Sequence, residues 1–256
     1  MKIPFYKYQG TGNDFVMIDN RDGIFPHDTS LVAKMCDRKF GIGADGLILI
    51  ENHNTLDFEM VYFNADGSQS LCGNGSRCAV SFANFLKIIE NDTKFLTIDG
   101  EYEAHLKDGL VHLHMRDQQT PEKFDAHYFL NNGSPHHIAF VEKVDEQDVY
   151  NQGAAIRYAD SYKPSGTNVN FVETKENNTI FVRTYERGVE NETLSCGTGI
   201  TASALAAADK GLNSPIAIEA KGGKLEVRFE QQNDKSFTNI WLIGPAEQVF
   251  IGQFDI

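Results

Sequence analysis

The chain of 256 residues lacks several features that would place it in a class at once. It has no apolar run near the length of a membrane span, and its first residues lack a signal-peptide core, so we expect neither a membrane protein nor a secreted one. It has only four cysteines, without a tight framework. This cysteine usage argues against a disulfide scaffold and favours a protein of the reducing cytoplasm.

Basic residues are in the minority, with 23 lysines and arginines against 36 acidic residues and a net charge of −13. The sequence shows neither a basic cluster nor an aromatic stacking platform. Both absences disfavour nucleic acid and anionic membranes as partners. The charge itself is typical of a solvated acidic surface and says little about the substrate.

Motifs for metal, redox and nucleotide chemistry are also missing. There is no Cys-x-x-Cys, and the spacing of Cys72 and Cys78 is wider than zinc sites normally use. The eight histidines are scattered, and exposed alternation along a strand accounts for His112 and His114. The short glycine turns lack the helix and acidic partner of a dinucleotide fingerprint. We therefore expect no metal and no nucleotide.

The chain instead contains one short motif twice, Cys72–Gly75 and Cys196–Gly199, and each copy opens a run of small helix-forming residues. A thiol at a helix N-terminus is acidified by the helix dipole and the exposed backbone N–H groups. The glycines let the backbone pass close to a ligand. We expect Cys72 and Cys196 to form a pair of proton-transfer groups, and Cys36 and Cys78 to be buried packing residues.

The segments around the two motifs follow the same order, which indicates an internal repeat. Each half reads as a glycine turn, a strand, a helical segment at about 28–40 or 146–161, a further strand with a glycine loop, the cysteine-capped helix, and three strands. The repeat predicts two domains, residues 1–118 and residues 119–249, with the tail at about 250–256 packing on the first.

The predicted loops contain several asparagine amides and one adjacent pair of opposite charges: Asn13, Asn64, Asn74, Asn168 and Glu186-Arg187. Asparagine beside glycine is often only a turn former, so each asparagine alone could serve either a structural turn or a bound ligand. If they converge, they suit a zwitterionic ligand. An arginine binds a carboxylate with two hydrogen bonds, and a carboxylate accepts from an ammonium group.

Over essentially its whole length, the sequence resembles the diaminopimelate epimerases. The cysteine motif with its arginine and the Tyr-Glu-Arg-Gly segment are together the most specific part of the resemblance. The matching segments are Gly12–Phe15, Gly41–Gly46, Phe63–Ser68, Cys72–Cys78, Gly133–His136, Asn168 before Phe171, Tyr185–Gly188 and Cys196–Gly199.

The resemblance implies an α+β fold of two pseudo-symmetric domains, each a mixed sheet wrapped around a central helix, with the active site in the cleft between them. It implies an enzyme without a cofactor that interconverts LL- and meso-2,6-diaminopimelate for lysine and peptidoglycan precursors. The family also implies a homodimer with a tyrosine at the interface near the C-terminus, where this chain has Phe250.

Roles for single residues also come from the resemblance. Cys72 and Cys196 would be the base and acid, with His136 and Glu186 supporting them. The reacting amino-acid end would be held by Asn13 and the backbone amides of Gly73, Asn74, Gly197 and Thr198. The distal end would be recognised by Asn64, Asn168, Arg187 and Glu186. Gly46 and Ser134 stand where relatives carry glutamine and asparagine, which would weaken the distal contacts.

Three other interpretations remain open from the residues. A proline or hydroxyproline racemase also uses paired cysteines, although Asn64, Asn168 and Arg187 favour a longer substrate. A non-catalytic amino-acid-binding relative would keep the ligand contacts without turnover. Oxidation of Cys72 and Cys196 to a disulfide would be an inactivating side reaction.

Overall fold

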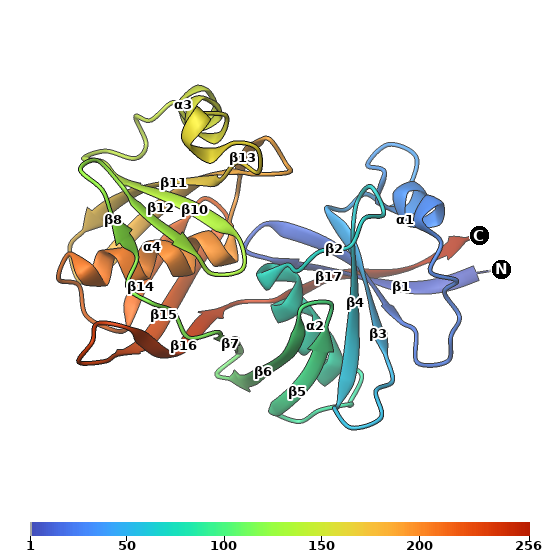
Figure 1. Cartoon of the computed structure of the whole chain (residues 1–256). Coiled ribbons are helices and arrows are strands. Elements are labelled where there is room, and N and C mark those ends of the chain that lie inside the picture. Colours follow the sequence, from blue (N-terminus) through green and yellow to red (C-terminus); the bar gives the residue numbers. More distant parts are fainter. Residues whose placement is uncertain (1) are drawn as a thin grey trace. The chain divides into compact units, whose positions relative to one another are not determined.

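The computed structural model describes residues 2–256, which form a chain rich in strands with few helices (Figure 1). The helices are α1 (Thr29–Cys36), α2 (Gly73–Phe85), α3 (Val149–Arg157), α4 (Gly197–Asp209) and the short 3-10 helix η1 (Asp160–Tyr162). The strands are β1 (Lys2–Gly10), β2 (Asn13–Asp19), β3 (Gly46–Glu51), β4 (Phe58–Asn64), β5 (Asp92–Thr97), β6 (Gly100–Lys107), β7 (Leu110–Met115), β8 (Glu122–Lys123), β9 (Tyr128–Asn131), β10 (Pro135–Phe140), β11 (Asn168–Lys175), β12 (Thr179–Glu186), β13 (Asn191–Thr193), β14 (Ile216–Ala220), β15 (Gly223–Gln231), β16 (Phe237–Gly244) and β17 (Glu247–Asp255).

The chain divides into two compact units. Unit 1 is Met1–Leu113 together with Gly244–Ile256, and unit 2 is His114–Ile243. Unit 1 includes the end of the chain because β17 runs antiparallel to β1, so that the two termini lie side by side (Figure 1). The domain limits expected at residues 118 and 119 stay a prediction, because compactness alone does not define an independently folding domain.

The two units have the same strand pairing. In unit 1, β2 is parallel to β3, β3 antiparallel to β4, and β4 parallel to β5. In unit 2, β10, β11, β12 and β14 repeat that series of parallel, antiparallel and parallel pairs. An antiparallel meander follows in each, through β6 and β7 or through β15 and β16. The predicted α+β fold with two similar halves is confirmed.

Each unit has one helix buried among its strands. Helix α2 packs against β1, β2, β3, β4, β6 and β17, and α4 packs against β9, β10, β11, β12, β14 and β15 (Figure 1). Ten of the 13 residues of α2 and eleven of the 13 residues of α4 are buried. Small and apolar residues make up most of both helices, as is typical of helices that are buried on most sides. The small residues after each cysteine therefore encode the two central helices.

The outer helices α1 and α3 are shorter than the sequence predicted. Helix α1 ends at Cys36 instead of near residue 40, because the Asp37 carboxylate accepts hydrogen bonds from the backbone N–H groups of Lys39 and Phe40 and closes a turn there. Helix α3 begins only after Asp148, whose side chain accepts from the N–H of Asn151 and so caps the helix. Local side-chain hydrogen bonds set both ends.

Two expectations about the burial of side chains are confirmed, and one is wrong. Cys36 and Cys78 are buried, and burial raises the pKa of the Cys36 thiol to about 12 and raises the pKa of the Cys78 thiol as well. His112 was expected on an exposed strand face, but it is buried. Its ring stacks on His105 with centroids 4.4 Å apart, which shields it from water.

Candidate active site

Helix α2 begins directly after Cys72, as predicted. Cys72 is the N-cap, with the extended backbone angles φ −136° and ψ 112°, and its Sγ accepts from the N–H of Gly75 at 3.4 Å. The first backbone N–H groups of a helix have no acceptor within the helix, so they are available to a ligand or to a capping side chain. Gly73 and Asn74 provide such groups beside the half-buried thiol.

Asn13 lies against this thiol, and Asp45 fixes the orientation of its amide. The Cys72 Sγ and the Asn74 Nδ2 both donate to Asn13 Oδ1, each at 3.4 Å. Asn13 Nδ2 donates to Asp45 Oδ2 at 2.6 Å. A carboxylate only accepts, so Asp45 holds the NH₂ group and turns the amide oxygen toward the thiol. Asp45 lies within a segment that carried the resemblance, but no role was predicted for it.

An ion cluster supports Asp45. Arg38 Nη2 lies 2.7 Å from Asp45 Oδ1 and 2.6 Å from Asp14 Oδ1, and Lys7 Nζ lies 2.7 Å from Asp14 Oδ2. Burial alone would raise the pKa of Asp14, but hydrogen bonds from Arg38 and Lys7 outweigh it and hold the pKa at about 2. Asp14 is therefore ionised at neutral pH and keeps Arg38 in position to hold Asp45.

Arg77 is a fully buried cation inside the first cysteine motif. Its Nη2 donates to Thr11 Oγ1 at 3.1 Å, whereas its Nε and Nη1 have no hydrogen-bond partner among residues 2–256. Burial lowers the pKa of Arg77, and negative charge on Cys78 and Cys72 opposes that shift. The attraction is mutual, so Arg77 favours negative charge at the N-terminus of α2.

Asn64 ends β4, and its amide is held by three hydroxyl groups. Its Oδ1 accepts from Tyr62 at 3.0 Å and from Ser70 at 3.1 Å, and its Nδ2 donates to Ser68 at 3.0 Å. Gly46 pairs with Asn64 across the β3–β4 ladder. A Cβ atom at Gly46 would lie 2.5 Å from Tyr62 Cε2, so the Tyr62 phenol fills the space of a side chain at position 46.

In unit 2, helix α4 begins directly after Cys196, again as predicted. Cys196 is the N-cap, with φ −120° and ψ 109°, and only 6% of its surface is exposed. Its Sγ lies 3.6 Å from Thr198 Oγ1, and Asn132 Nδ2 donates to the Thr198 carbonyl at 2.9 Å. The two cysteines thus occupy equivalent positions of the repeat, one in each unit.

Asn168 and Ser134 hold the loop that carries Arg187. Asn168 Oδ1 accepts from the backbone N–H of Arg187 at 2.8 Å, and its Nδ2 donates to Ser134 Oγ at 2.8 Å and to the Pro135 carbonyl at 3.0 Å. Both Nδ2 hydrogens are therefore used within the protein. Glu186 Oε2 accepts from Thr193 Oγ1 at 2.8 Å.

His136 lies on β10 and is fully buried. Burial, with a smaller contribution from the charge of Arg187, lowers the pKa of His136 to about 3. The imidazole is therefore neutral across the physiological pH range. Each unit thus brings its own share of the predicted residues together: Asn13, Cys72, Gly73 and Asn74 in unit 1, and Asn168 with Arg187 in unit 2.

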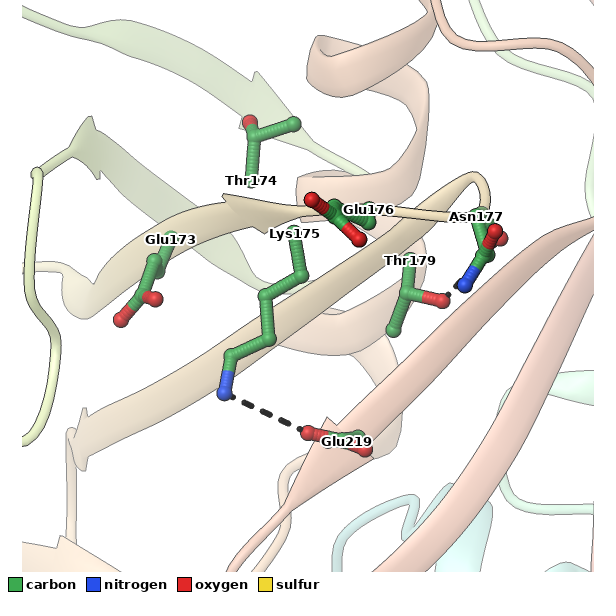
Figure 2. Close-up of a pocket in the computed structure, with 7 residues that line it drawn as sticks. All are labelled: Glu173, Thr174, Lys175, Glu176, Asn177, Thr179 and Glu219. Atoms are coloured by element: carbon green, nitrogen blue, oxygen red, sulfur yellow. Dashed lines mark hydrogen bonds and ion pairs between the residues drawn. The ribbon is translucent and has the colours of Figure 1, made fainter.

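A surface hollow lies elsewhere, at the end of the β11–β12 hairpin (Figure 2). Its walls are Glu173, Thr174, Lys175, Glu176, Asn177, Thr179 and Glu219. Lys175 Nζ lies 3.5 Å from Glu219 Oε2 across it. None of the predicted site residues lines this hollow, so we assign it no part in catalysis.

Comparison with known proteins relates nearly the whole chain to one group of enzymes. The family model for diaminopimelate epimerase matches residues 5–121 and 128–249. A diaminopimelate epimerase of Flavobacterium psychrophilum is 54% identical over 253 residues, covering 97% of this chain and 98% of that protein. One from Hydrogenobaculum is 42% identical over 271 residues, covering 96% of each.

Solved structures share the fold at low sequence identity. A phenazine biosynthesis protein of the PhzF family from Bacillus anthracis aligns with a TM-score of 0.78 at 13% identity over the full length of both chains. A hydroxyproline epimerase from Agrobacterium vitis aligns with a TM-score of 0.73 at 14% identity, covering 98% of this chain and 92% of that one. At these identities the likeness concerns the fold alone.

Proposed function

Because the chain belongs to the diaminopimelate epimerase family, we propose that it interconverts LL- and meso-2,6-diaminopimelate in the synthesis of lysine and peptidoglycan precursors. The observation that carries the proposal is the placement of Cys72 and Cys196 at the N-termini of the two buried helices. A proline or hydroxyproline racemase is not favoured, because the hydroxyproline epimerase is related to this chain only at the level of the fold.

The reaction inverts a carbon that carries a hydrogen. A proton must leave one face of the carbon and another must return to the opposite face. Two bases, one from each unit, meet this requirement without movement of a base around the carbanion. Cys72 and Cys196 are the proposed pair, in an active site in the cleft between the units: one thiolate removes the α-proton, the other thiol donates one, and the roles exchange with direction.

The carbanion is the difficult intermediate, because no cofactor is expected to delocalise its charge. The N-termini of α2 and α4 supply fixed dipoles and N–H groups, from Gly73, Asn74, Gly197 and Thr198, to the α-carboxylate where negative charge develops. Asn13, already oriented by Asp45, adds a side-chain amide at the same end. Preorganised donors of this kind typically contribute about a hundredfold or more in rate.

The other amino-acid end of the substrate binds, in this proposal, to the loop residues. Arg187 pairs with the distal carboxylate, and Glu186 accepts from the distal ammonium. Asn64 contributes its amide. Asn168 acts mainly by holding the backbone of Arg187, since its own hydrogen-bonding groups already bond to protein atoms. His136 supports the thiol chemistry.

The setting proposed for the enzyme is a homodimer in the cytoplasm. None of the four cysteines forms a disulfide, which fits a reducing compartment. Three consecutive residues of β17, Val249, Phe250 and Ile251, are exposed, and an exposed apolar strip of this kind favours burial against a second copy. Among residues 2–256 the structure has no helix whose length and apolarity would suit a bilayer.

Proton NMR in deuterated water tests the reaction directly. Purified protein incubated with LL-diaminopimelate, without pyridoxal phosphate, should place deuterium at one α-position and produce the meso isomer. Proline serves as the competing substrate and should show no exchange. If diaminopimelate keeps both α-protons while the protein is folded, the proposed function is wrong.

The cysteine variants supply the matched controls for this experiment. Cys72→Ala and Cys196→Ala should each reduce turnover by about a thousandfold or more, because each removes one proton-transfer group. Cys36→Ala should retain most of the activity, since Cys36 packs in the core of unit 1. Circular dichroism checks that each variant folds. Near-normal epimerisation by either active-site variant would reject the two-thiol mechanism.

A further inference from the structure

A buried amide, Asn170 on β11, has only one possible orientation. The Asn170 side chain is fully buried, and its Nδ2 lies 3.0 Å from the backbone carbonyl oxygen of His137. A carbonyl oxygen only accepts, so the NH₂ group must face it. The amide oxygen then points to the Thr184 hydroxyl, which donates to Asn170 Oδ1 at 2.9 Å. The opposite orientation would place Asn170 Oδ1 against the His137 carbonyl oxygen, and two acceptors repel each other.

The orientation of Asn170 fixes the proton of His136. Asn170 Nδ2 also lies 3.3 Å from His136 Nδ1, and it has an N–H to give there. His136 Nδ1 must therefore carry a lone pair. A neutral imidazole has one N–H, so the proton is on Nε2. The very low pKa of His136 excludes the doubly protonated ring at neutral pH.

The resulting Nε2–H is buried and has no acceptor among residues 2–256. An unsatisfied buried donor costs about 1–3 kcal/mol, so its presence calls for a reason. Asn170 also lies beside the second cysteine motif. A Cβ atom on Gly199 would lie 2.4 Å from Asn170 Oδ1 and 3.4 Å from Cys196 Sγ.

From this geometry we infer that Asn170 is a positioning residue, which holds His136 as the Nε2–H tautomer so that His136 donates a hydrogen bond to an anionic group during the reaction. In this tautomer His136 is a neutral hydrogen-bond donor, and its unprotonated nitrogen, Nδ1, already accepts from Asn170. The acceptor is a thiolate or a carboxylate, the two anions present in epimerisation. This catalytic role rests on the proposed function, whereas the tautomer itself does not.

Long-range ¹H–¹⁵N correlation NMR of the ¹⁵N-labelled full chain reads the tautomer without any turnover. The His136 signals are identified by their loss in His136→Gln. At neutral pH the ring should show a protonated Nε2 and an unprotonated Nδ1. A protonated Nδ1 in the unaltered protein would overturn the inference, whether or not the protein epimerises diaminopimelate.

Two Asn170 variants test the positioning role. Asn170→Asp replaces the donor with an acceptor and should move the His136 proton to Nδ1. Asn170→Ala removes the partner and should give a mixture of the two tautomers. The control is Asn178→Asp, whose amide donates to the carbonyls of Asn213 and Pro215 and contacts no imidazole. If at least one Asn170 variant folds and keeps the pure Nε2–H tautomer, Asn170 is not the positioning residue.

Activity separates a donor from a base. In His136→Gln the amide Nε2 can replace the imidazole N–H, although glutamine cannot accept a proton from a thiol. In His136→Leu the donor is lost. We expect the glutamine variant to retain at least about tenfold more kcat than the leucine variant, as removal of one preorganised donor implies. Equal loss in both, with a normal fold, would show that His136 does not act as a donor.

Discussion

Among single residues, Tyr62 shows how this chain tolerates the glycine at position 46. The phenol fills the space that a residue-46 side chain would need, and its hydroxyl donates to Asn64. A polar group thus stands near Asn64 although residue 46 has no side chain. The sequence led us to expect weaker distal contacts because of Gly46, and we propose that the Tyr62 hydroxyl compensates for the missing side chain.

Tyr62→Phe should reduce kcat/KM for diaminopimelate by about fivefold, mainly through a higher KM. The change removes one of the two hydroxyl donors to Asn64 Oδ1, and a lost hydrogen bond costs about 1 kcal/mol. Steady-state kinetics measures it. Tyr102→Phe is the matched control, since its hydroxyl donates to Asp99 in the same unit. Equal kinetics in the two variants would remove Tyr62 from substrate recognition.

The residues that the sequence predicted best are those in short, local motifs. Cys72, Gly73 and Asn74 are adjacent in the chain, so one helix start places all three. The contacts of Asp45 and Asn170 were not predicted, because their partners Asn13 and His136 are 32 and 34 residues away in the sequence. Only pairing of distant strands brings such groups together, and nothing in a local pattern specifies that pairing.

Among the elements, corresponding glycines in α2 and α4 have different surroundings. A Cβ atom on Gly75 would meet the ends of the Ile48 and Met60 side chains at 3.1 Å and 3.4 Å. A Cβ atom on Gly199 would lie 2.4 Å from Asn170 Oδ1, which Thr184 and the His137 carbonyl hold in place. The repeat is thus similar in fold but not in the packing at its two helix starts.

Alanine at the two positions should therefore have unequal effects. Gly199→Ala should lower the free energy of unfolding by about 1–3 kcal/mol, as overpacking of a core does, and should also lower kcat. Gly75→Ala should cost less than about 1 kcal/mol, because flexible side chains can move and alanine favours a helix. Urea unfolding compares them. A larger cost for Gly75→Ala would contradict this view of the packing.

The order of the elements was predictable from the repeat, whereas their ends were not. The helices after Cys72 and Cys196 begin where the sequence placed them, since a cysteine followed by glycine marks both starts. Helices α1 and α3 were predicted too long, because single aspartate side chains end or begin them. Strands β1 and β17 pair although their residues are about 240 positions apart in the sequence, which no local periodicity could indicate.

For the molecule as a whole, the predicted homodimer depends on the exposed apolar residues of β17, Val249, Phe250 and Ile251. Phe250→Asp should convert a dimer to a monomer, because it places a charge where an apolar contact is expected. Sedimentation velocity measures the mass. Val189→Asp is the control: Val189 is 57% exposed, like the strip residues, but lies in unit 2. If Phe250→Asp leaves the mass unchanged, the interface is elsewhere or absent.

The pairing of β1 with β17 also sets the order in which a growing chain can finish its parts. Strand β1 is translated before every residue of unit 2, whereas β17, one of its two partner strands, is translated after all of them. Every residue of unit 2 is available earlier, once Ile243 has been made. Unit 1 can therefore be completed only after the whole of unit 2 has been made, and until then the edge of β1 that pairs with β17 lacks that partner.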